Sequence, residues 1–157
     1  MKRSSIASTF AIAAVAALAP GLTPLAKAEG RTCSNATIKG AYARTDQGFV
    51  TLPNSAPVPL AGLSLMTFDG NGRWMITGYI SVNGAHPPGP ATSTGTYTVN
   101  ADCTGHAEPD IAPSGRTGQA FIVIVDGGNG VQIFPLDQNG TNICVARRIF
   151  PTGDSQE

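Results

Sequence analysis

Residues 69–82 read DGNGRWMITGYISV, a turn sequence followed by a stretch of alternating side chains. The turn part, residues 69–72, suits a tight hairpin because Gly and Asn reach positive φ at low steric cost. In the stretch that follows, side chains two apart share one face of an extended chain. One face carries Trp74, Ile76, Gly78, Ile80 and Val82, and the other carries Met75, Thr77, Tyr79 and Ser81. Similar Gly-rich turns recur at residues 126–130 and 137–140, so the sequence predicts a series of β-hairpins.

Period-two alternation recurs along the chain, whereas helical periodicity is absent after Ala28. Besides residues 74–82 and 93–100, strands are expected at residues 36–44, 48–52, 60–68, 104–108, 119–125, 131–136 and 143–150. The proline-rich segments 56–59 and 85–90 are predicted to be loops, because proline lacks the ladder donor. Eight or nine short strands with tight turns indicate an all-β sandwich or an up-and-down barrel.

The first 28 residues have the pattern of a secretory signal peptide. Lys2 and Arg3 precede an apolar run over residues 6–19, and Ala26-Lys27-Ala28 forms a cleavage site before Glu29. A membrane anchor is the alternative, but a span needs about 18 or more apolar residues and this run is shorter. We therefore expect a secreted or periplasmic protein that leaves the membrane after cleavage, with one domain over residues 29–157.

Composition excludes several kinds of partner. Three of the ten Lys and Arg residues lie in residues 1–28, so seven remain against ten Asp and Glu. A mildly acidic chain without a basic stripe is a poor match for nucleic acid. The sequence holds no catalytic signature, and we expect no cofactor.

Metal binding has two candidate segments. His106, Glu108 and Asp110 would share a strand face and could hold a divalent ion or exchange protons; the alternative is a solvated edge that discourages sheet pairing. The Asp-Gly turns lack the late Glu of a calcium loop, and the cysteines lack zinc-site spacing. We expect no metal site.

Three segments together resemble a group of small, uncharacterised secreted proteins of Gram-negative bacteria. They are residues 33–42 (CSNATIKGAY), 67–72 (TFDGNG) and 95–105 (GTYTVNADCTG). The resemblance implies an antiparallel β-barrel of about eight strands, similar to the allene oxide cyclase or calycin type. It brings no established activity and no catalytic residues.

The three cysteines all lie in the part expected to be exported, where disulfides form. Cys33 and Cys103 belong to the segments of the resemblance, whereas Cys144 lies in an apolar stretch typical of a buried thiol. We predict a Cys33–Cys103 disulfide. A Cys33–Cys144 bond is the rival, since the first and last strands of a barrel are neighbours.

Two kinds of side chain are candidates for a ligand site inside such a barrel. Aromatic residues could line a cavity or fill the core. One of two adjacent arginines must face inward, because neighbours on a strand point to opposite faces. The candidates are Tyr42, Phe68, Trp74, Tyr97, Arg147 and Arg148.

The segment Phe121–Val125 is apolar on both faces, so a second subunit or a packed terminal segment is expected to cover its outer side. For the whole protein, the sequence favours a non-enzymatic binder of a small apolar ligand or of a protein, and a homo-oligomer is one way to cover this strand. A barrel enzyme of the cyclase or isomerase kind is the alternative.

Overall fold

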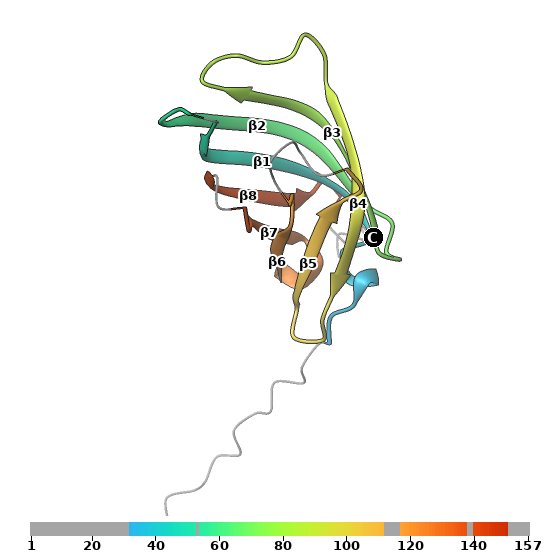
Figure 1. The fold of residues 1–157 in the computed structure, drawn as a ribbon. Helices are drawn as coiled ribbons and strands as arrows, with labels where there is room; N and C mark the ends of the chain where they lie inside the picture. The colour runs from blue at the N-terminus through green and yellow to red at the C-terminus, as the bar shows by residue number, and fades with distance from the viewer. Residues whose placement is uncertain (1–31, 53, 112–116, 138–139, 151–157) are drawn as a thin grey trace, which may run out of the picture. The chain divides into compact units, whose positions relative to one another are not determined.

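The chain forms a closed barrel of eight antiparallel strands (Figure 1). The computed structural model describes residues 32–52, 54–111, 117–137 and 140–150. The strands are β1 (Gly40–Thr51), β2 (Pro57–Phe68), β3 (Arg73–Val82), β4 (Ala91–Val99), β5 (Thr104–Pro109), β6 (Ala120–Val125), β7 (Gly130–Pro135) and β8 (Gly140–Arg148). Each strand pairs with the next, and β8 pairs with β1 from Tyr42↔Arg148 to Val50↔Gly140. The predicted all-β, up-and-down barrel is confirmed.

One end of the barrel is closed by a plug. It consists of the short 3-10 helix η1 (Asn35–Ile38), the short helix η2 (Asp126–Gly128) and the turns β2–β3 and β4–β5. The predicted hairpin at residues 69–72 is present: the Asp69 carboxylate accepts from the amides of Asn71 (2.7 Å) and Arg73 (2.9 Å), while Gly70 and Gly72 have positive φ. Such an Asx turn fixes the register of β2 and β3.

The predicted Cys33–Cys103 disulfide is present and ties η1 to the β4–β5 turn, while Cys144 is a buried free thiol. Above the plug the core is aromatic. Phe68 packs edge-on against Tyr42 at a ring distance of 5.5 Å and against Tyr97 at 5.0 Å. The closed half of the barrel is therefore filled by side chains.

Two strand predictions were wrong. Residues 36–44 and 48–52 are not separate strands: residues 36–38 are helical in η1, and β1 runs unbroken over residues 40–51. Residues 45–47, between the two predicted strands, belong to β1, and Asp46 among them points into the barrel. The segment 56–59 is not all loop, since β2 begins at Pro57. Proline is tolerated there because β2 pairs with β3 only from Leu60 onward. The other predicted strands are displaced by up to three residues at their ends.

In β6 the inward side chains are Ala120, Ile122 and Ile124, all buried. Phe121, Val123 and Val125 face outward and are half-buried, and Phe121 contacts the ring of His106 at 5.7 Å. Phe121, Val123 and Val125 are therefore the outward side chains that a second subunit or a packed terminal segment was expected to cover. Residues 1–28, with the expected signal peptide, lie outside the described residues. Among the residues that the structure describes, no helix has the length and apolarity to cross a membrane.

Candidate ligand pocket in the barrel

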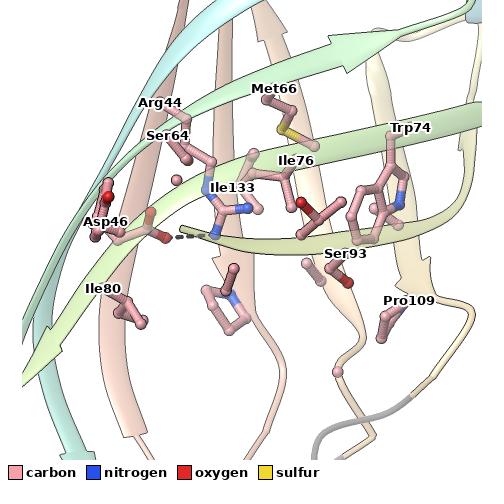
Figure 2. Close-up of a pocket in the computed structure, with 18 residues that line it drawn as sticks. Arg44, Asp46, Ser64, Met66, Trp74, Ile76, Ile80, Ser93, Pro109 and Ile133 are labelled. Atoms are coloured by element: carbon pink, nitrogen blue, oxygen red, sulfur yellow. Dashed lines mark hydrogen bonds and ion pairs between the residues drawn. The ribbon is translucent and has the colours of Figure 1, made fainter. Parts of the chain in front are cut away.

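A cavity of about 340 Å³ occupies the half of the barrel away from the plug. Most of its walls are apolar, and Figure 2 shows Trp74, Ile76, Met66 and Ile133 facing the same space. These residues alternate with outward ones along their strands, so the period-two alternation of side chains directs them to the interior. The result is an apolar chamber inside the barrel.

One side of this chamber is polar. Arg44 and Asp46 lie two apart on β1 and therefore share its inner face, and Figure 2 shows them joined by an ion pair. In the strand register Ser64 of β2 lies opposite Arg44, and Cys144 of β8 lies opposite Asp46. The Arg44 Nη2 also lies 3.2 Å from the Cys144 Sγ. We call these four residues the polar wall.

The polar wall is shielded from water. Asp46 is only 8% exposed, and the Arg44 side chain is 19% exposed. Burial lowers the pKa of Arg44, but attraction to the Cys144 thiolate, which forms only at high pH, and to the Asp46 carboxylate outweighs this and raises the pKa overall, so the guanidinium stays charged. Burial also raises the pKa of the Cys144 thiol to about 12, which keeps it protonated near neutral pH. The wall thus holds one positive and one negative charge.

Two polar atoms of this wall are buried without a hydrogen-bond partner, the Arg44 Nε and the Ser64 Oγ. Buried polar groups are normally paired, so orphans beside a cavity are unusual. Glycines keep the space over the wall free. A Cβ on Gly78 would collide with Ser64, and one on Gly62 would lie 3.2 Å from the Asp46 Oδ2.

The residues predicted to line a site divide between pocket and plug. Trp74 lines the pocket, and its indole nitrogen donates to the Thr96 carbonyl at 3.0 Å. Tyr42, Phe68 and Tyr97 lie in the core of the closed end, where the Tyr42 hydroxyl donates to the Gly128 carbonyl at 2.5 Å. Burial raises the pKa of Tyr42 to about 12, which keeps this donor in place.

Of the two adjacent arginines, Arg148 faces inward and Arg147 is exposed. Arg148 lies over the Tyr42 ring at 4.8 Å and donates to the carbonyls of Lys39, Thr37 and Gly128. A carboxylate partner was expected for the inward arginine, but these partners are main-chain oxygens of η1, η2 and the residue after η1. Its visible role is to hold the plug.

The row of His106, Glu108 and Asp110 lies on the outer face of the barrel, with all three residues exposed. Arg73 donates two hydrogen bonds to Asp110, at 2.7 and 2.6 Å, and the bonds from Arg73 and Thr94 lower the pKa of that carboxyl. The described parts of the chain contain no group of three or more His, Cys, Asp or Glu suited to a metal ion. Asp110 of this row thus takes part in an exposed ion pair with Arg73, while His106 contacts the Phe121 ring and Glu108 accepts from the Thr96 hydroxyl.

The polar wall was missed by sequence reasoning. Its signal was present in residues 41–48, AYARTDQG, where Tyr42, Arg44 and Asp46 occupy alternate positions. Charges of opposite sign two apart on the face that also carries a core tyrosine indicate an inward ion pair. That pattern becomes visible only once residues 40–51 are recognised as one strand.

The three segments that carry the family resemblance meet at the plug. The Tyr97 hydroxyl donates to the Asn35 carbonyl at 3.1 Å and accepts from the Gly70 amide at 3.0 Å. The Asn35 side chain accepts from the Val99 amide at 2.8 Å. These motifs have a structural role at the closed end. Comparison of the chain with family models, curated proteins and solved structures finds no match.

Proposed function

We propose that this protein binds a small, mostly apolar ligand inside its barrel. The observation that carries the proposal is the cavity of about 340 Å³ between apolar walls and one buried polar wall. Small-molecule sites combine such walls with a few polar groups, in volumes of about 300 Å³ and above. The same cavity favours a small ligand over a protein partner.

Binding without chemical conversion is favoured by the protonation states of the polar wall. The Cys144 thiol and the Arg44 guanidinium both keep their protons near neutral pH, because both pKa values are raised. General acid-base catalysis works best with groups that titrate near the working pH. A cyclase or isomerase activity remains the alternative, and conversion of a bound ligand during incubation would support it.

We further propose export to an oxidising compartment and kinship with the small secreted barrels named above. Support comes from the Cys33–Cys103 disulfide and from the signal-like residues 1–28. Intact mass of protein recovered outside the cytoplasm is expected to show a chain that begins at Glu29. Retention of residues 1–28 in exported material would refute the signal peptide.

The binding proposal can be tested by fluorescence, because Trp74 is the single tryptophan of the chain and lines the pocket. Titration with N-phenyl-1-naphthylamine, an uncharged apolar fluorophore, is expected to quench Trp74 emission and to enhance the emission of the probe. Saturation at micromolar concentration with one probe per chain would support an internal site.

A pair of variants locates the probe. Ser93 lies at the exposed part of the pocket lining, so the larger side chain of Ser93→Phe fills part of the cavity without replacing a buried contact. Met75 on the outer face of β3 is 48% exposed, and Met75→Phe is the matched control. We expect Ser93→Phe to weaken binding at least tenfold and Met75→Phe to leave it unchanged. Equal effects, or no binding by the wild type, would refute the proposal.

A further inference from the structure

The polar wall carries information about the charge of the ligand, and an inference from it rests on the binding function proposed above. Among the described residues, Arg44 and Asp46 are the charged ones that line the cavity, and they are bonded to each other. Cys144 beside them is held as a neutral thiol. The described residues of the lining therefore contribute a formal charge of zero, one guanidinium against one carboxylate.

A charged ligand would disturb this balance. A carboxylate placed against Arg44 would also approach Asp46, which is 8% exposed and has little water to screen it. An ammonium group placed against Asp46 would approach Arg44 in the same way. Like charges at close range in a buried site repel strongly, and a ligand charge must lose its own hydration to enter.

Hydrogen-bonding capacity is nevertheless left over on this wall. The bonds that Arg44 makes to Asp46 and Cys144 both use Nη2, and its Nε has no partner. The hydroxyl of Ser64, across the strand pair from Arg44, also has no partner. The Arg44 Nε–H can only donate, and the serine hydroxyl can donate as well as accept, so one acceptor oxygen would satisfy both groups.

We infer that the pocket selects uncharged ligands in which an apolar body carries a carbonyl or hydroxyl oxygen, with that oxygen directed at Arg44 and Ser64. An uncharged oxygen accepts from a guanidinium or a hydroxyl without adding charge to the balanced pair. Both donor atoms are buried in this structure, so the binding mode requires the Ser64 hydroxyl and the Arg44 head to turn toward the ligand. The ligand class is thus a ketone, ester, alcohol or phenol with an aromatic or aliphatic body.

The test uses four naphthalenes with the same ring body and different heads. They are 2-acetylnaphthalene, 2-ethylnaphthalene, 2-naphthoate and 2-naphthylmethylammonium, each measured by its displacement of N-phenyl-1-naphthylamine at neutral pH. We expect the ketone to bind at least tenfold more tightly than either ion and more tightly than the hydrocarbon.

Variants connect this order to the polar wall. Asp46→Asn leaves Arg44 uncompensated, so naphthoate is expected to gain about tenfold or more relative to the ketone, the effect of one charge-assisted hydrogen bond. The double variant Arg44→Met/Asp46→Leu replaces the pair by apolar side chains and leaves Ser64 as the donor, so it is expected to reduce the preference for the ketone over the hydrocarbon. Asp110→Asn removes a carboxylate from the exposed ion pair with Arg73 and is expected to leave all four affinities unchanged.

The outcomes separate this inference from the function on which it rests. If N-phenyl-1-naphthylamine does not bind the wild type, the binding function itself fails. If the probe binds but naphthoate displaces it as well as the ketone does, the selection for uncharged ligands is wrong and the binding function stands. If Asp46→Asn does not fold, the order of the four ligands on the wild type and on the double variant still decides the inference.

Discussion

Replacement of Arg148 by Met is predicted to loosen the plug, and its neighbour Arg147 provides a matched control. Arg148 donates to main-chain carbonyls of Thr37, Gly128 and Lys39 and covers the Tyr42 ring. Lys39 is exposed, so water can replace the bond there, and the Gly128 oxygen keeps its bond from Tyr42. The loss is therefore counted as one to two charged hydrogen bonds, at about 1.5 to 3 kcal/mol each, together with a cation–π contact of about 1 kcal/mol.

The expected cost, taken near the lower end of this sum, is about 3 kcal/mol of unfolding free energy, whereas Arg147→Met on the exposed side of the same strand should stay within about 0.5 kcal/mol. Urea denaturation followed by circular dichroism measures both. With a slope of about 2 kcal/mol per molar urea, Arg148→Met should unfold about 1.5 M earlier than the wild type. Equal midpoints for the two variants would show that Arg148 does not hold the closed end.

Three further predictions concern other parts of the barrel. Arg44→Met leaves Asp46 buried without its partner and should cost about 3 kcal/mol or more in urea unfolding, whereas the double variant Arg44→Met/Asp46→Leu should stay within about 1 kcal/mol of wild type; a single variant as stable as the double would contradict a buried pair. Folding raises the pKa of Cys144 from 9.0 to about 12, so the contribution of this thiol to the free energy of unfolding is complete below pH 9 and is lost as the pH rises toward 12. The stability of the wild type should therefore fall more steeply between pH 9 and 12 than that of Cys144→Ala. Parallel stability profiles of the two proteins would contradict this. Val123→Lys places a charge on the outer face of β6, so we expect light scattering to show that the variant dissociates from an oligomer and thermal unfolding to show a lower melting temperature. If the wild type is a monomer and the variant is equally stable, no second subunit or terminal segment covers that face.

The all-β fold could be predicted because its signals are local. The Asx-Gly turn at residues 69–72 and the alternation after it act within a few residues, and the structure contains both. The boundaries of β1 could not be predicted, because residues 45–47 are polar and interrupt the apolar alternation. Asp46 among them faces a cavity, which the sequence alone does not reveal. A strand beside an internal cavity can direct polar side chains inward, so the rule that inward positions are apolar does not identify such a strand.

The residues predicted to line a ligand site were aromatic side chains and arginines, and among them Trp74 lines the cavity. Arg148 and Tyr42 belong to the plug instead, because both lie within a few residues of the closed end in β8 and β1. Which end of an up-and-down barrel is filled depends on where η1 packs, and this contact between Ile38 and the core is not encoded by strand periodicity.

The placement of the plug at one end has an evolutionary and engineering consequence. The turns 69–72 and 100–103 share the closed end with the disulfide, whereas the connections 52–56 and 83–90 follow the opposite strand ends. Substitutions around the mouth can therefore accumulate while the anchoring contacts stay constant, as loops on a rigid scaffold commonly do. A library that randomises residues 83–90 would test the proposed binding function on an unchanged frame.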